Sequence, residues 1–189
     1  MKHIFVRSLL VLLFALVLVG NLFADDDLPF DTYPQALGAY VGRISGIGIG
    51  YQKWNDTYGF QFAAGGMYHP LMEGGHDIFN YNAGAQLQYP LFSDDYSTWL
   101  AGRLYVFGGL NHRGYKEAVY DESSYSYVEG DFHAEFGLGG GIGVEGVLFQ
   151  HFAVSVELVY GLFWRPLEEK LPEQFLLEML PQVSLRYRY

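Results

Sequence analysis

The 189-residue sequence contains no cysteine, and its 21 acidic side chains outnumber its 11 basic ones. Without cysteine the chain cannot form disulfides, thiolate zinc sites or thiol nucleophiles, and it cannot carry a lipid on a cysteine. The formal net charge of -10 disfavours nucleic acid as a partner, because phosphates attract basic surfaces. The length suits a single domain with a core rather than two domains.

The sequence has only one long apolar run, and it lies at the start. Lys2 and Arg7 precede the run from Leu9 to Val19, and the chain then becomes polar and acidic. This order is typical of a secretory signal peptide, which we predict at 1–24 with cleavage near Ala24. A helix of this run would be about 16 Å long, roughly half the hydrocarbon thickness of a bilayer, so we do not expect it to stay as an anchor.

The rest of the sequence alternates between apolar and small or polar side chains with a period of two, which is typical of β-strands. From 132 to 148 the even positions are apolar or glycine, whereas the odd positions from 131 to 145 carry Asp, His, Glu and glycine. The alternation predicts eight strands, at residues 35–43, 46–54, 57–69, 78–91, 97–111, 129–149, 151–164 and 175–189.

The connections between these strands alternate in length. After a first turn at 43–45 they are short at 55–56, long at 70–77, short at 93–95, long at 112–128, minimal at Gln150 and long at 165–174. Short turns at one end and long loops at the other are typical of bacterial outer-membrane barrels, whose turns face the periplasm. An even number of strands returns both termini to the periplasmic side.

A period of two fits a soluble barrel as well as a membrane barrel, so the polar face decides between them. That face carries four glycines at alternate positions from Gly137 to Gly143, which suits a crowded interior better than a wet exterior. On the apolar face, Tyr58 and Tyr68 would lie about 25 Å apart along the membrane normal, the height of the band between aromatic girdles. We therefore expect an all-β, eight-stranded, antiparallel up-and-down transmembrane barrel over 35–189.

The last strand has aromatic residues at its final and third-last positions, and Val183, Leu185, Tyr187 and Tyr189 share its apolar face. This ending resembles the C-terminal assembly signal of outer-membrane barrels, although phenylalanine is the commoner last residue. The layout over 35–189 is similar to the small OmpA-type and opacity-type barrels. The resemblance implies insertion by the outer-membrane assembly machinery, contact with outer-membrane lipid, extracellular long loops and a short periplasmic segment at 25–34. It implies no particular activity.

The interior of an eight-stranded barrel is just wide enough to be filled by side chains. Four charged residues fall at similar heights on the inward faces of neighbouring strands: Arg103, Glu145, Glu157 and Arg186. They should pair, because an unpaired buried charge costs several kcal/mol. A structural plug is the main interpretation of this charge cluster, and a proton or ion path is the alternative.

Higher in the interior, large rings should face missing side chains, with Tyr105 and Phe107 across from Gly139 and Gly141. A second polar layer is expected nearer the long loops, from His69, His133, Glu135 and Glu178. No histidine pair has a spacing diagnostic of metal binding, so we predict neither a metal nor a cofactor.

The longest predicted loop begins at His112 and ends at Gly130, and it is rich in tyrosine and serine. Its tyrosines are Tyr115, Tyr120, Tyr125 and Tyr127. Tyrosine with serine gives rigid amphipathic contact area, so this loop is the candidate site for an extracellular ligand. Alternatively, the tyrosines extend a hairpin and have no partner.

Catalysis has little support in the sequence. The nearest local group, His151, Ser155 and Glu157, puts the histidine at a turn and the other two side chains in the interior. We predict a non-enzymatic outer-membrane barrel with a plugged polar lumen. The alternatives are a narrow channel for small or hydrophobic solutes and a lipid-modifying enzyme, which would need a catalytic group on the lipid face near the outer rim.

Overall fold

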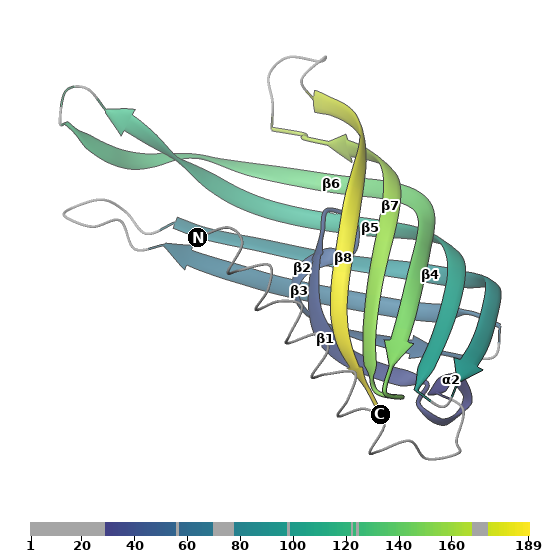
Figure 1. The fold of residues 1–189 in the computed structure, drawn as a ribbon. Helices are drawn as coiled ribbons and strands as arrows, with labels where there is room; N and C mark the ends of the chain where they lie inside the picture. Colours follow the sequence, from purple (N-terminus) through teal and green to yellow (C-terminus); the bar gives the residue numbers. More distant parts are fainter. Residues whose placement is uncertain are drawn as a thin grey trace, which may run out of the picture.

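The computed structural model describes residues 29–55, 57–69, 78–97, 99–121, 123, 125–167 and 174–189. These residues form a short helix and eight strands: α2 (Pro29–Thr32), β1 (Gln35–Gly42), β2 (Gly46–Trp54), β3 (Gly59–His69), β4 (Ile78–Ser97), β5 (Leu100–Asp121), β6 (Ser126–Leu148), β7 (Phe152–Trp164) and β8 (Phe175–Arg188). Each strand pairs antiparallel with the next and β1 pairs with β8, which closes the sheet (Figure 1). The predicted eight-stranded up-and-down barrel is confirmed.

The predicted signal peptide at 1–24 lies outside the described residues. Within the described part of the chain, no helix has the length and apolar character needed to cross a membrane. The barrel has two ends, the turn end and the loop end. The turn end holds α2 and the C-terminal end of β8, and the loop end is the opposite one (Figure 1).

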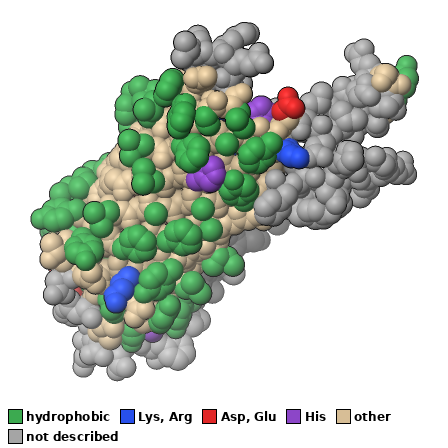
Figure 2. Space-filling model, turned by 180° about the vertical axis from the view of Figure 1, so that it is seen from behind, with side chains coloured by type: hydrophobic (Ala, Val, Ile, Leu, Met, Phe, Trp, Pro, Cys, Tyr) green, Lys and Arg blue, Asp and Glu red, His purple; other side chains and the backbone are tan. Residues whose placement is uncertain are grey.

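Many large apolar side chains are exposed on the outer wall, and several charged side chains are buried inside the barrel. Phe136, Val154 and Leu185 are 45%, 41% and 58% exposed, whereas Glu145 and Arg186 are 0% and 1% exposed. Hydrophobic side chains are accordingly spread over the outer wall in Figure 2. The predicted orientation of the two faces is confirmed.

The β5–β6 hairpin is longer than the sequence pattern indicates, and it projects beyond the other strands in Figure 1. The prediction of a loop over 112–128 is wrong, because Tyr120 pairs with Tyr127 and Asp121 pairs with Ser126. The polar composition of this stretch hides its strands. β4 likewise continues past its predicted end at Leu91, because a bulge between Pro90 and Phe92 accommodates the proline.

The turn between β1 and β2 folds into the barrel instead of extending the wall. This turn, Arg43–Ser45, is called the tip below. Ile44 at its centre is fully buried, and the positive φ angles of Gly46 (97°) and Gly48 (134°) direct the start of β2 inward, a backbone conformation that favours glycine. The sequence predicted a turn at 43–45 but not its inward position.

Candidate functional site

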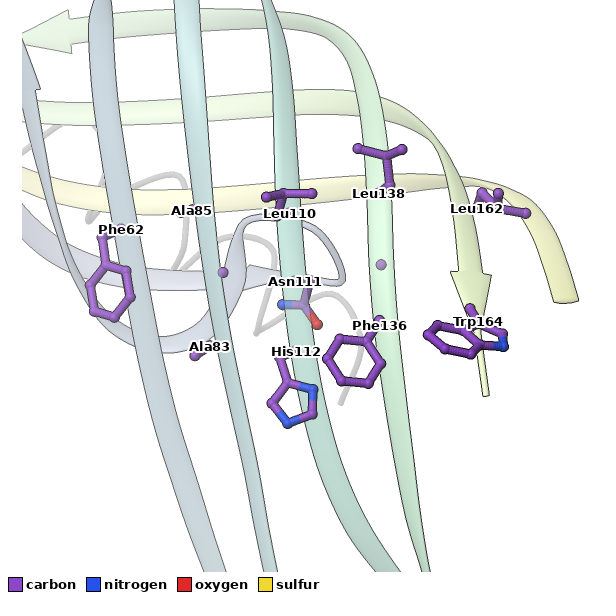
Figure 3. A pocket seen from close by; sticks show the side chains of 12 residues that line it. Phe62, Ala83, Ala85, Leu110, Asn111, His112, Phe136, Leu138, Leu162 and Trp164 are labelled. Atoms are coloured by element: carbon purple, nitrogen blue, oxygen red, sulfur yellow. The ribbon is translucent and has the colours of Figure 1, made fainter. Parts of the chain in front are cut away.

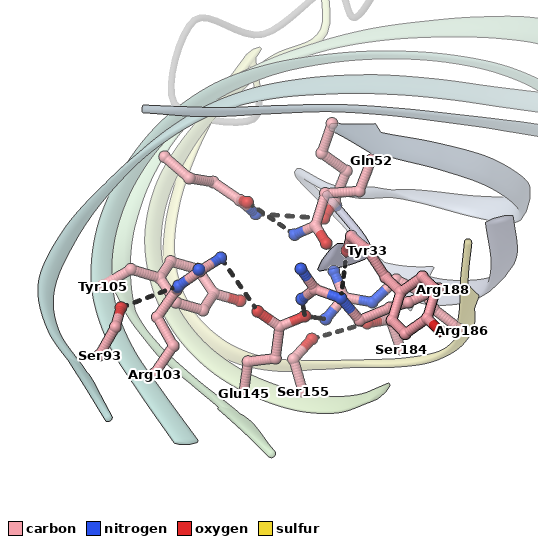
Figure 4. Close-up of polar contacts among 12 residues, drawn as sticks. Tyr33, Gln52, Ser93, Arg103, Tyr105, Glu145, Ser155, Ser184, Arg186 and Arg188 are labelled. Atoms are coloured by element: carbon pink, nitrogen blue, oxygen red, sulfur yellow. Dashed lines mark hydrogen bonds and ion pairs between the residues drawn. The ribbon is translucent and has the colours of Figure 1, made fainter. Parts of the chain in front are cut away.

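At the turn end of the interior, three arginines surround one glutamate (Figure 4). The buried Glu145 carboxylate lies 3.0 Å from Arg186, 3.3 Å from Arg188 and 3.7 Å from Arg103. Arg103 and Glu145 are direct partners in the β5–β6 ladder. The structure thus brings together three of the four residues of the predicted charge cluster. Arg188, which was not included, shares the inward face of β8 with Arg186, and this alternation was the signal for it.

Glu157 is held by neutral groups, so its predicted pairing with arginine is wrong. Its carboxylate accepts hydrogen bonds from the Tyr105 hydroxyl at 2.7 Å and from the side-chain amides of Gln182 at 2.9 Å and Gln86 at 3.1 Å. The register explains this difference, because Glu157 lies beside Gly143 on β6 and Gln182 on β8. The interior therefore has a charged layer and, next to it, an amide layer.

The segment after the predicted leader lies against the interior at the turn end, where an open cavity of about 890 Å³ remains beside Phe30 and Pro34. The Phe30 and Trp54 rings sandwich the Arg103 guanidinium at 4.0 and 3.9 Å, an arrangement stabilised by cation–π attraction. The Tyr33 carbonyl accepts a 2.8 Å hydrogen bond from Arg188. The expected N-terminal segment at 25–34 thus folds against the interior over its described residues.

Glycines on the surrounding strands make room for the tip. Gly109, Gly139 and Gly161 face one another across β5, β6 and β7. A Cβ at Gly109 or Gly139 would lie 2.8 or 2.9 Å from the Ile44 side chain. The predicted crowding of the glycine face is therefore real, and the tip is what fills much of that space.

Large rings face glycines on the neighbouring strand, as predicted. Phe107 faces Gly141, whereas Tyr105 faces Gly143, which was not among the predicted glycines. Alternation predicts which residues point inward, but it does not predict the stagger between β5 and β6, because the register of a hairpin also depends on the geometry of its turn.

Ion pairs hold the tip in place. Arg43 donates to Glu135 at 3.1 and 2.7 Å and to Glu178, and it lies 4.0 Å over the Phe163 ring. The backbone amides of Ile44 and Ser45 both donate to the Gln182 side-chain oxygen, at 2.7 and 2.9 Å. The tip is thus bonded to β6 and β8 as well as packed against β5 and β7.

The predicted second polar layer is present only in part. Glu135 and Glu178 share Arg43, and Arg165 also donates to Glu135 at 2.8 Å. His133 stacks instead on Tyr115, and the side chain of His69 lies outside the described residues. Among the side chains that are described, no three His, Asp or Glu groups lie together as a metal site requires.

The four tyrosines of the predicted binding loop do not lie in one loop. Tyr115 is a buried residue of β5, with Arg113 over its ring at 4.2 Å. Tyr120 and Tyr127 are paired strand residues whose side chains lie outside the described part. Tyr125 lies in the turn itself, with a φ of 51° and 84% exposure. Of the two tyrosine side chains that the structure describes here, Tyr115 is buried and Tyr125 is exposed.

A row of four rings crosses the outer wall near the loop end, from Tyr81 through His112 and Phe136 to Trp164. The His112 ring stacks on Phe136 with centroids 4.4 Å apart, and the next pair is 5.8 Å apart. The Tyr81 hydroxyl lies 2.9 Å from His112 Nε2, and Nδ1 lies 3.3 Å from the Glu135 carbonyl. Gly114 leaves room for the Tyr81 ring in this row, because a Cβ at position 114 would collide with that ring.

An apolar pocket of about 460 Å³ lies against this row (Figure 3). Ala83 and Ala85 leave the space, and larger outward side chains border it, among them Phe62, Leu110 and Leu162. Sequence reasoning did not select His112. The signal was available, since an ionisable side chain shares the outward face of β5 with Leu110.

No family model, curated protein or solved structure matches this chain. The structure therefore shows a small eight-stranded barrel, and the likeness to OmpA-type and opacity-type proteins is one of strand pattern.

The three residues considered for catalysis have other partners. His151 Nδ1 lies 2.8 Å from the Arg188 carbonyl, and the Ser155 hydroxyl lies 2.6 Å from that of Ser184. Glu157 belongs to the amide layer. The candidate assembly signal takes the predicted outward positions on β8 and at the residue after it, and all four of its side chains are about half exposed: Val183, Leu185, Tyr187 and Tyr189.

Proposed function

We propose that this protein is an integral β-barrel of the bacterial outer membrane, made with a signal peptide and not an enzyme, whose lumen is filled and does not conduct. The observation that carries the proposal is an exposed apolar wall around a charged interior. On β7 every second residue from Phe152 to Trp164 is exposed, over a length that corresponds to about 30 Å along the normal of a tilted strand. That height is enough for the apolar band of a membrane barrel.

Three levels of side chains support a plug rather than a channel. Phe30 and Trp54 lie against Arg103 at the turn end, beside an open cavity of about 890 Å³. The charged and amide layers follow, and the tip with Ile44 fills the space below the loop end. A channel would require the tip to leave its position. The charge cluster is accordingly assigned a structural role, which is the common role of buried ion pairs that fix register.

The outward face of β8 and the long hairpin suggest how the protein meets its partners. Apolar side chains at alternate positions up to Tyr189 support recognition by the outer-membrane assembly machinery. The β5–β6 hairpin, with Tyr125 in its turn, is the proposed contact for an extracellular ligand.

Two measurements on the full chain test the proposal. Outer-membrane fractionation followed by gel electrophoresis with and without boiling should show a membrane-bound, heat-modifiable band. Planar-bilayer recording should show no steady openings. A protein recovered from the soluble periplasm would contradict the membrane location, and steady conductance would contradict the filled lumen and favour the narrow channel.

A further inference from the structure

We infer that the interior near the loop end binds a small dissolved oxyanion, a carboxylate or a phosphate, with Arg113 as the charged group and the Asn80 and Asn82 amides as further donors. The inference goes beyond the proposed function, because it adds a ligand site inside the barrel. It does not depend on the membrane location, since the site is formed by the strands of the barrel themselves.

The site is a cavity at the point where β2 leaves the wall. The β2–β3 ladder ends at Ile49, whereas β3 continues beside β4 as far as His69. A cavity of about 300 Å³ remains where the two strands separate. Three residues that border it have no side chains to fill it: Gly48, Gly65 and Gly66.

The Arg113 guanidinium lines this cavity and has no carboxylate partner among the described residues. Its direct neighbour in the β5–β6 ladder is Glu135, but that carboxylate is bonded to Arg43 and Arg165. The contact that Arg113 does make is with the Tyr115 ring, at 4.2 Å from the centroid. A partly buried guanidinium that stacks on a ring and keeps its N–H groups is suited to bind an anion from outside the chain.

Two asparagine side chains present donors to the same cavity. The Asn82 oxygen accepts hydrogen bonds from the Ile47 amide at 3.1 Å and from Asn111 Nδ2 at 3.0 Å. The Asn80 oxygen accepts one from the Lys116 amide at 3.0 Å. Because a backbone N–H can only donate, these bonds fix both oxygens and leave the two Nδ2 groups as donors. Asn82 is 7% exposed, and its Nδ2 has no hydrogen-bond partner in the described part of the chain.

The available side-chain groups select the class of ligand. A cation would meet the positive Arg113 and amide oxygens that are already in use, and an apolar ligand would leave Arg113 and Asn82 unpaired. An oxyanion would meet a guanidinium and two amide N–H groups. Asn82 and Arg113 are direct partners in the β4–β5 ladder, so both side chains can reach one anion.

Nuclear magnetic resonance titration of the full chain in neutral detergent micelles provides the test. Acetate and inorganic phosphate are the probes, each added against a constant sodium chloride background. We expect saturable shifts of the N–H resonances of the Arg113 guanidinium and the Asn82 amide. The probe that binds more tightly identifies the ligand as a carboxylate or a phosphate.

Two variants remove the site in different ways. Arg113→Gln removes the charge and should weaken binding by at least about ten-fold, measured at the Asn82 amide. Asn82→Asp can accept the same two hydrogen bonds as the asparagine, but its second oxygen replaces Nδ2 and should pair with Arg113. This internal carboxylate should abolish binding of both probes, measured at the Arg113 resonance. Lys53→Gln, which removes a positive charge at the turn end, is the matched control and should leave the affinity unchanged.

Equal affinity of the unaltered chain and Arg113→Gln would overturn the assignment of the charged group. Binding retained by Asn82→Asp would overturn the position of the anion between the two side chains. Shifts that do not saturate, or that sodium chloride alone reproduces, would overturn the oxyanion site. Heat-modifiable migration of each variant shows that the barrel has formed. Recovery of the chain from the soluble periplasm would contradict the membrane location and leave this titration unaffected, so the two failures are distinguishable.

Discussion

Glu145 is the anion around which the turn end of the lumen is organised. Three guanidinium groups approach its carboxylate, and the carboxylate is fully buried. In such a site the charges are interdependent, because water cannot replace a lost partner. The cluster therefore contributes to stability chiefly through the penalty that any single deletion would impose.

Replacing Glu145 with glutamine should destabilise the barrel by about 3–5 kcal/mol, since three buried cations would lose their anion. Urea titration of the vesicle-inserted protein, followed by heat-modifiable migration, measures this free energy of unfolding. Glu157→Gln is the matched comparison. It exchanges a carboxylate held by neutral donors and should cost only about 1–3 kcal/mol. Equal losses in the two variants would contradict the distinction between the layers.

For single residues, the sequence predicts correctly which side chains point into the barrel, but it does not predict which residues they contact there. Strict alternation identified Arg103, Glu145 and Arg186 as inward residues, because a period of two leaves only two faces to choose between. The partner of Glu157 depends on the register between β6, β7 and β8, which is determined by where each turn falls. In the observed register, amide side chains rather than guanidinium groups lie next to the Glu157 carboxylate.

Among the structural elements, the tip is the feature that alternation could not reveal. In the sequence, a three-residue turn between two glycines has the pattern of an ordinary hairpin. Its inward position depends on contacts with residues far along the chain, such as Gly137 and Gln182. The length of the β5–β6 hairpin was missed for a related reason. Its outer part has the composition of a loop, and only pairing across the hairpin identifies it as strand.

Overfilling the space of the tip should destabilise the barrel. At Gly137 a Cβ would lie 3.0 Å from both Ile44 and Phe163, so Gly137→Val should cost about 1–3 kcal/mol by overpacking. Adding Ile44→Ala to Gly137→Val should recover part of that loss, because the cavity of one substitution accepts the added methyl groups of the other. A double-mutant cycle from urea titrations measures this coupling. Strictly additive losses would show that the tip does not occupy this space.

Releasing the ion pairs of the tip should loosen it without opening the barrel wall. Arg43→Ala removes the contacts to Glu135 and Glu178, whereas Glu135 keeps Arg165. We expect faster hydrogen exchange at the amides of Ile44 and Ser45, with exchange in β7 unchanged. Exchange mass spectrometry of the inserted protein reports both regions. Unaltered protection of the tip would show that its packing, and not Arg43, holds it.

For the whole molecule, the apolar outer wall predicts how the energetic cost of a charge depends on its position. Leu158 lies at the middle of the outward face of β7 and Phe152 at its turn end. In a bilayer, Leu158→Arg should cost about 2–4 kcal/mol and Phe152→Arg about 0–1 kcal/mol, because the penalty falls towards the interface. Urea titrations in vesicles compare the two variants. A water-soluble barrel would show neither penalty.

The hydrogen bonds of the tip begin one residue beyond the last pair of residues that joins β1 to β8. Val41 pairs with Val183, and the neighbouring Gln182 accepts both tip amides. The contacts of the tip therefore continue the contacts between β1 and β8 by one residue. The same three residues thus fill part of the interior and bond the first strand to the last, so a change in the tip acts on the closure of the sheet as well as on the space inside it.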